Sequence, residues 1–148
     1  MIMNPTAIKH VVVDGHSLTL ESFVAIARYN ATVELAPSAL EAMQKSRALA
    51  EKIAAEGRVA YGITTGFGEF QKVAVPKEMS NQLSTNLILS HCTAAGEPYA
   101  DEIVRGMMLL RANALCGGVS GVRPLLVEML LEMLNKGVTP VVPQKGSL

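Results

Sequence analysis

Hydrophobic residues recur with helical spacing along most of this chain, and only the first patterned segment is different. Residues 10–15 form a β-branched run that ends in Asp-Gly, which is typical of a short strand followed by a turn. Residues 17–19 could return as a second strand, so the sequence predicts a small β-hairpin at the start. Helical spacing then begins at Leu20, with Thr19 available as the N-cap.

Four more helices are predicted, each bounded by proline and glycine. The first begins at residues 37–38, where Ser38 and Glu41 have the spacing of a capping box, and it ends at Gly57. The other three run over residues 76–96, 98–118 and 124–137. The fold class expected is therefore mainly α, with a small N-terminal β element followed by packed helices.

The predicted helix after Pro98 carries two apolar stripes, which predicts burial on several of its sides. One stripe consists of Ile103, Met107, Leu110 and Ala114, and the other of Val104, Met108 and Leu115.

Between residues 58 and 75 the helical spacing disappears, and the segment YGITTGFG places three glycines around Tyr61. A loop of about 18 residues is long enough to require a functional or an ordering role. Composition leaves two interpretations open: an ordered turn with Tyr61 and Phe67 in the core, or a mobile lid around Tyr61. A phosphate-binding loop is disfavoured, because the GxxxxGK[ST] pattern and a preceding apolar strand are missing.

Ser90 and His91 lie near the end of the helix predicted over residues 76–96, where Ser90 continues a polar line and His91 an apolar one. Polar groups beside an apolar row need partners, but a single histidine there is more often a satisfied core residue than a ligand. His10 and His16 are expected at the surface.

Arg111, Asn113 and Arg123 occur in apolar or glycine-rich surroundings, so they are expected to brace helix ends rather than to act in catalysis. Cys92 and Cys116 are expected to be reduced and largely buried. Neither cysteine has the spacing to other ligands that a metal requires, so no metal is expected.

The balance of charge bears on possible partners. Thirteen basic and thirteen acidic residues cancel without forming charge runs, so neither a nucleic acid nor a membrane is expected as a partner. Apolar residues make up 49% of the 148 residues, so some apolar surface is expected to meet another subunit or further chain. The sequence has no signal-peptide pattern and no stretch long enough to span a membrane, which predicts a cytoplasmic protein.

Four motifs occur in order: YGITTGFG, NLILSH, RANAL followed by GVSGVRP, and GVTPVVPQKGSL. Together they resemble the N-terminal portion of the aromatic amino acid ammonia-lyase family, and within it most closely the histidine-specific branch. The resemblance implies a fumarase/aspartase-like fold, with residues 1–148 as a single N-terminal domain of a longer lyase. It also implies a homotetramer for the complete protein.

Enzymes of this family use an electrophilic 4-methylidene-imidazole-5-one group (MIO), which forms by cyclisation of an internal Ala-Ser-Gly. The resemblance places that triplet just beyond Leu148, so the cofactor is expected outside this chain and the fragment is expected to be inactive alone. An engineered truncation, proteolysis, or division of the sequence at the modified residue would each explain such an end.

By resemblance, Tyr61 matches the tyrosine that removes the substrate's β-proton. Because that proton is weakly acidic, the base must be activated by its surroundings. Ser90 and His91 match the positions that line the pocket for the substrate side chain. The residues expected to shape the loop around the base are Thr65, Gly66, Phe67 and Gly68.

The Ser-His pair favours L-histidine as the substrate, with urocanate and ammonia as products of histidine degradation. A tyrosine or phenylalanine ammonia-lyase, or a 2,3-aminomutase, is the alternative within the same family. A non-catalytic helical interaction module is the alternative from another class, supported by the eight methionines and the apolar excess.

Overall fold

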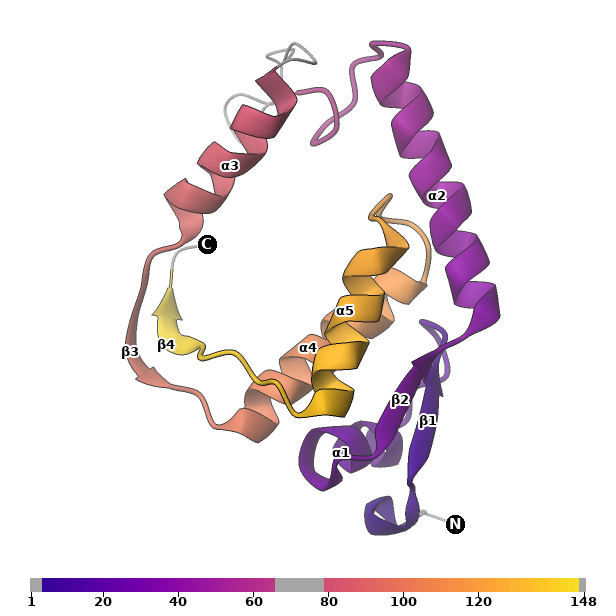
Figure 1. Cartoon of the computed structure of the whole chain (residues 1–148), viewed down its shortest axis with the longest axis vertical. Coiled ribbons are helices and arrows are strands. Elements are labelled where there is room, and N and C mark those ends of the chain that lie inside the picture. The colour runs from indigo at the N-terminus through magenta and orange to yellow at the C-terminus, as the bar shows by residue number, and fades with distance from the viewer. Residues whose placement is uncertain (1–3, 66–78, 147–148) are drawn as a thin grey trace. The chain divides into compact units, whose positions relative to one another are not determined.

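The computed structural model describes residues 4–65 and 79–146, and it is mainly helical, as the sequence predicts (Figure 1). Two compact units share the chain. Unit 1 consists of Met1–Arg47 and Pro98–Val142, and unit 2 of Ala48–Glu97 and Pro143–Leu148. Over the described residues, no helix is long and apolar enough to cross a membrane.

Unit 1 contains most of the regular structure. Its elements are η1 (Pro5–Ala7), β1 (His10–Val13), α1 (Leu20–Tyr29), β2 (Thr32–Leu35), the first half of α2 (Pro37–Ala55), α4 (Asp101–Cys116) and α5 (Pro124–Lys136).

Two helix starts test the predicted caps. Thr19 caps α1 as predicted, because its hydroxyl accepts a hydrogen bond from the Ser22 backbone N–H at 3.2 Å. The predicted capping box of α2 is wrong: the helix already begins at Pro37, so Ser38 lies inside its first turn. Proline is favoured at such a first position, because its missing N–H would have no partner within the helix.

The predicted β-hairpin at the start of the chain is also wrong. β1 pairs with β2 in parallel, with His10 opposite Thr32, and residues 17–19 form no strand. The Asp-Gly pair serves a different turn, in which the Asp14 carboxylate accepts hydrogen bonds from the backbone N–H groups of His16 and Ser17, each at 2.8 Å. This turn leads into α1, and α1 connects the two parallel strands.

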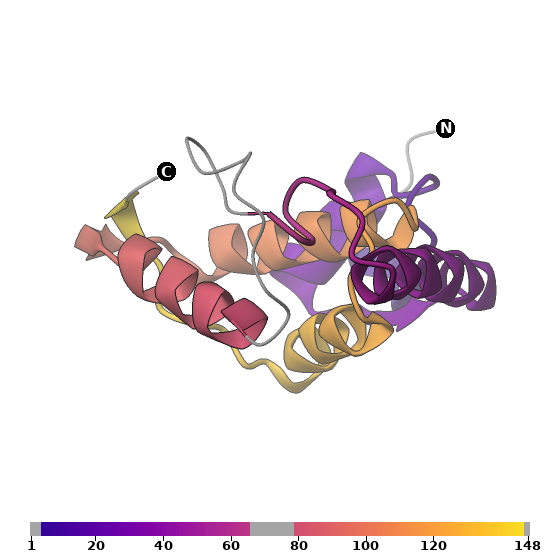
Figure 2. The same ribbon diagram turned by 90° about the horizontal axis from the view of Figure 1, so that it is seen from above.

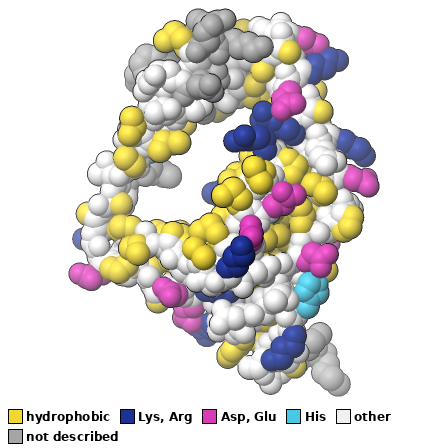
Figure 3. All heavy atoms as spheres, viewed as in Figure 1, with side chains coloured by type: hydrophobic (Ala, Val, Ile, Leu, Met, Phe, Trp, Pro, Cys, Tyr) yellow, Lys and Arg dark blue, Asp and Glu magenta, His cyan; other side chains and the backbone are white. Residues whose placement is uncertain are grey.

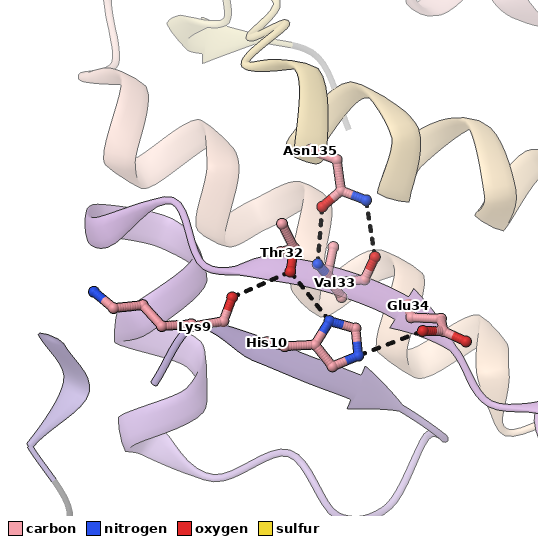
Figure 4. A network of polar contacts seen from close by, with 6 residues as sticks. All are labelled: Lys9, His10, Thr32, Val33, Glu34 and Asn135. Carbon is pink, nitrogen blue, oxygen red and sulfur yellow. Dashed lines mark hydrogen bonds and ion pairs between the residues drawn. The ribbon is translucent and has the colours of Figure 1, made fainter. Parts of the chain in front are cut away.

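A side chain from α5 extends this small sheet (Figure 4). Asn135 accepts a hydrogen bond from the Val33 N–H at 2.8 Å and donates one to the Val33 carbonyl at 2.9 Å. The amide therefore pairs with β2 as a neighbouring strand would. Across the β1–β2 pair, the His10 ring lies 3.1 Å from the Thr32 hydroxyl and 3.4 Å from the Glu34 carboxylate.

The core of unit 1 forms where α4 lies between α1 and α5 (Figure 2). Gly106 permits the close approach of α1, because a Cβ at this position would come 2.7 Å from the Phe23 ring. The larger side chains that are almost completely buried in this unit are Val13, Ile26, Met43, Val104, Leu109 and Val127.

A buried arginine joins the ends of two helices in this core. The Arg105 guanidinium donates hydrogen bonds to the carbonyls of Ile26 at 2.9 Å, Leu134 at 3.0 Å and Ala27 at 3.2 Å. Burial lowers the pKa of Arg105, and the nearby Asp101 carboxylate opposes that shift. The sequence pattern did not single out Arg105. Asn113, which the pattern did assign to bracing, accepts a hydrogen bond from the Gly15 N–H at 3.2 Å.

The prediction that α4 is buried on several sides is only half correct within this chain. The stripe of Val104, Met108 and Leu115 is buried, whereas Ile103, Met107, Leu110 and Ala114 are all exposed. Further apolar side chains lie on the surface over α5 (Figure 3), and they include Leu125, Leu126 and Met129. These faces have the apolar character that favours contact with other polypeptide.

Unit 2 contains the second half of α2, the turn that follows it, α3 (Ser80–His91), β3 (Ala94–Pro98) and β4 (Pro143–Gly146). The predicted helix over residues 76–96 ends earlier than expected, at His91, and β3 occupies the positions after it. β3 and β4 form their own two-stranded sheet, in which the strands run in opposite directions (Figure 1).

Candidate functional site

Tyr61 begins a tight turn a few residues after α2. The Ala60 carbonyl accepts hydrogen bonds from the backbone N–H groups of Ile63 at 3.1 Å and Thr64 at 3.0 Å. Gly62 has a φ of +73°, which a residue without a Cβ adopts at little cost. The Tyr61 side chain is 64% exposed, so it does not pack into the core of this chain as one of the two interpretations requires.

Two threonines hold the turn in place. The Thr64 hydroxyl accepts a hydrogen bond from the Ala60 N–H at 2.9 Å and donates to the Arg58 carbonyl. Thr65 is buried, and its hydroxyl accepts from the Gly62 N–H at 3.3 Å. A loop-shaping role for Thr65 was predicted, but the role of Thr64 was not, although threonine hydroxyls commonly bond to nearby backbone in turns. Gly66, Phe67 and Gly68 lie outside the described residues.

Ser90 and His91 occupy the last turn of α3, and both are exposed. The Ser90 hydroxyl donates to the Leu87 carbonyl at 2.9 Å, and Nδ1 of His91 lies 2.9 Å from both the Ser90 hydroxyl and that carbonyl. The Ser90 hydroxyl hydrogen is used in the bond to the Leu87 carbonyl, so it cannot also be donated to His91. The contact between Nδ1 and the hydroxyl oxygen is therefore a hydrogen bond when Nδ1 carries the ring hydrogen and donates it. Nε2 of His91 then presents a lone pair to a ligand.

The two cysteines differ from each other. Cys92 follows His91 in the sequence and is exposed, so the prediction of a buried thiol is wrong for this residue. Its thiol donates a hydrogen bond to the Leu89 carbonyl at 3.2 Å. Cys116 is buried as predicted, and burial raises the pKa of its thiol to about 11. Among the described residues, no group of three or more His, Cys, Asp or Glu side chains gathers as a metal site would require.

β3 begins three positions after His91, and it brings β4 to this part of unit 2 (Figure 1). At one end of the pair, the Tyr99 N–H donates to the Val142 carbonyl at 2.9 Å. At the other end, the Thr93 carbonyl lies 3.5 Å from where a Cβ on Gly146 would stand. The segment that the resemblance places directly before the electrophile therefore lies beside the strand that follows the Ser-His pair.

Unit 2 thus contains the chemistry-bearing residues that the sequence singled out: the phenol of Tyr61, the hydroxyl of Ser90 and the imidazole of His91. An exposed phenol and an exposed imidazole can each accept or donate a proton, and the hydroxyl can orient the imidazole. One groove of unit 1 has a different character. It has a volume of about 430 Å³, lies between α1 and α4, and is lined mainly by apolar side chains, including Phe23 and Met107.

The sequence model of a family described as aromatic amino acid lyase matches residues 18–148. Histidine ammonia-lyase from Alkaliphilus metalliredigens is 49% identical over 140 residues, which are 95% of this chain and 28% of that relative's length. The chain therefore spans little more than a quarter of the curated relative.

Solved structures give a similar result. Tyrosine aminomutase from Streptomyces globisporus superimposes with a TM-score of 0.87 at 39% identity, covering 93% of this chain and 26% of that chain. Histidine ammonia-lyase from Trypanosoma cruzi superimposes with a TM-score of 0.83 at 37% identity, covering 93% of this chain and 26% of that one. With a family match over nearly its whole length, the chain belongs to the aromatic amino acid lyase family.

Proposed function

We propose that this chain is the N-terminal part of a histidine ammonia-lyase, which eliminates ammonia from L-histidine without oxidation and releases urocanate. The observation that carries the proposal is the placement of Tyr61 on an ordered, exposed turn in the same unit as the Ser90–His91 pair. The similarity to histidine ammonia-lyases supports the choice of substrate.

Tyr61 acts as the base in this proposal. Its phenolic oxygen accepts the proton from the substrate's β-carbon, while the turn made by Gly62, Thr64 and Thr65 fixes the backbone from which the ring projects. A base held in one place loses less freedom when substrate arrives, which favours proton transfer. Gly66, Phe67 and Gly68 continue this loop, and we propose that they help to shape it.

Ser90 and His91 bind the substrate side chain. The Ser90 hydroxyl and the Leu87 carbonyl fix the His91 ring, so that its Nε2 lone pair can accept a hydrogen bond from the N–H of a substrate imidazole. A phenylalanine substrate offers no such donor. The pair therefore discriminates in favour of a side chain with a polar hydrogen.

The family's electrophile, MIO, would supply activation of the substrate's amino group. None of the 148 residues forms an Ala-Ser-Gly triplet, so this chain cannot make the group from its own residues. A position for it near these residues is supported by β4, which lies beside β3 and belongs to the unit that holds Tyr61 and His91.

A tyrosine ammonia-lyase or 2,3-aminomutase is the second candidate, favoured by the 39% identity to a tyrosine aminomutase. A tyrosine hydroxyl could also donate to Nε2 of His91, so the described geometry permits both substrates. The experiment supplies the complete polypeptide that carries this chain with His, Tyr and Phe separately, and identifies each product. Urocanate as the main product supports the proposal, whereas coumarate, cinnamate or a β-amino acid would overturn the choice of histidine.

The fragment itself provides a second test. We expect the isolated 148 residues to release no urocanate, because the electrophile is missing, and robust turnover by the fragment would contradict the proposed mechanism. We also propose that the complete protein is a cytoplasmic homotetramer. The exposed apolar stripe of Ile103, Met107 and Leu110 on α4 supports assembly with further polypeptide.

A further inference from the structure

Gly96 lies in the middle of β3, where a strand backbone normally has a negative φ. Its φ is instead +91°, a conformation that residues with a Cβ rarely adopt. Glycine inside a strand often marks a bend or the close approach of another segment. The path of β3 therefore depends on the absence of a side chain at this position.

The segment that lies over Gly96 is β4. A Cβ at residue 96 would be 3.8 Å from both Cγ and Cδ of Lys145, so the apolar stem of Lys145 lies across β3 at this point. Lys145 precedes Gly146, the last described residue before Leu148. The contact therefore holds β4 one residue before the described part of the chain ends.

Burial contributes little to holding this pair of strands together. All five residues of β3 are exposed, as are three of the four residues of β4. A two-stranded sheet without a buried face is only marginally stable. Local backbone geometry therefore decides whether β3 and β4 stay paired, and residue 96 is where that geometry is most demanding.

We propose that Gly96 is a positioning residue for formation of the electrophile. Its left-handed backbone lets β3 pass beneath the Lys145 stem and stay paired with β4, and through this pairing Gly96 would set where the residues that follow β4 in the complete polypeptide lie relative to Ser90 and His91. The inference rests on the proposed function, because the cyclising triplet is not among the 148 residues.

The affected step is the ring closure of the triplet. The glycine amide nitrogen bonds to the alanine carbonyl carbon, whose oxygen leaves as water with the hydrogens of the glycine and serine amides. The serine hydroxyl leaves with its Cα hydrogen as a second water, and no oxidant or reductant is needed. Because the nitrogen must be held close to the carbonyl carbon, a freely moving β4 lowers the fraction of chains that close.

The test compares Gly96→Ala with Gly57→Ala in the complete polypeptide that carries this chain. Gly57 is a matched control, since it also lies in unit 2 with a positive φ of +64°, and a Cβ there would meet nothing within 4 Å. Intact mass measures the fraction of chains that have lost two waters. Amide hydrogen exchange over residues 93–99 measures the pairing, and thermal unfolding measures general stability.

We expect similar decreases in Tm for the two variants, but a several-fold smaller dehydrated fraction and faster exchange only in Gly96→Ala. Equal dehydrated fractions in the two variants would overturn the inference. A wild-type protein that has lost no water would instead overturn the proposed function, and the inference with it.

A second variant decides the matter if Gly96→Ala does not accumulate as folded protein. Lys145→Ala removes the stem over Gly96 and leaves the backbone unchanged. We expect it to lower the dehydrated fraction relative to Lys136→Ala, which changes an exposed lysine at the end of α5. An unchanged dehydrated fraction in Lys145→Ala would count against the positioning role.

Discussion

Tyr61 is the single side chain on which the proposed chemistry depends most. Replacing it with phenylalanine removes the proton acceptor while keeping the ring, so we expect urocanate formation by the complete polypeptide to fall by roughly 10²- to 10⁴-fold. Urocanate absorbance measures the rate, and circular dichroism checks that the fold is kept.

Tyr29→Phe is the matched control, because Tyr29 is also an exposed tyrosine but lies at the end of α1 in unit 1. Its turnover should equal that of the wild type. If Tyr61→Phe also retained full turnover, Tyr61 would not be the base. Either another residue would then remove the proton, or this part of the polypeptide would serve only as a non-catalytic interaction module.

Asp14 should give the protein a measurable dependence on acid. The backbone N–H groups of Ser17 and His16 lower the pKa of this carboxyl from 3.8 to about 2 in the folded state. Because the folded pKa lies below the unfolded one, the carboxylate stabilises the folded state above pH 3.8, and this contribution disappears as the pH falls toward about 2.

We therefore expect Asp14→Ala to lower the Tm at neutral pH, and the gap from the wild type to narrow between pH 4 and about pH 2. Thermal unfolding over a pH series measures the gap. A gap that stays constant down to pH 2 would show that the carboxylate charge has no part in the turn.

Among the elements, α1 and α5 are joined through Arg105, and the join can be tested by removing it. Arg105→Met removes the guanidinium donor from three carbonyls at the ends of these helices, although the Leu134 carbonyl keeps the Gly137 N–H at 3.3 Å, and we expect a loss of about 3 kcal/mol in the free energy of unfolding. Urea unfolding should show a lower midpoint. Arg111 is an exposed arginine of α4, the helix that also contains Arg105, so Arg111→Met should lower the free energy of unfolding far less. Equal losses would contradict the role of Arg105.

The elements that the sequence predicts well are those with local signals. α1 begins after Thr19, and α5 ends at Gly137 with a φ of +68°, as the capping patterns indicate. The hairpin prediction was wrong because the partner of β1 starts 22 positions after it, beyond any local signal. An Asp-Gly pair is compatible both with a hairpin turn and with the turn in which the Asp14 side chain bonds to the backbone, so the dipeptide alone does not distinguish them.

In the candidate site, too, the features with local signals are predicted best. Tyr61 lies in a glycine-rich turn and Ser90–His91 near the end of a helix, as the local sequence indicates. β3 has the sequence AAGEP, which offers no β-branched residue, and it becomes a strand only by pairing with residues that come 45 or more positions later. Periodicity found both stripes of α4, but it cannot tell which polypeptide covers each one.

For the whole molecule, the exposed stripe of α4 gives a test of assembly. Met107 is 47% exposed and lines the apolar groove between α1 and α4. Met107→Glu places a charge there, and we expect the complete protein to elute as a smaller species than the proposed tetramer, as measured by light scattering.

Leu49→Glu is the matched control, because Leu49 is an exposed apolar residue of α2 that does not line this groove. It should keep the wild-type mass. A Met107→Glu protein that also keeps the wild-type mass would place the subunit contacts elsewhere.

Unit 1 is made of two stretches that are far apart in the sequence, so its first stretch leaves the ribosome well before its second. The two hydrogen bonds between Asn135 and Val33 span 102 positions, and the one that Arg105 donates to the Ile26 carbonyl spans 79. At roughly 5–20 residues per second, the ribosome needs several seconds to add the intervening chain. Over that interval β1, α1 and β2 have emerged without α4 and α5 to cover them, so we expect this nascent segment to be where chaperones are needed most.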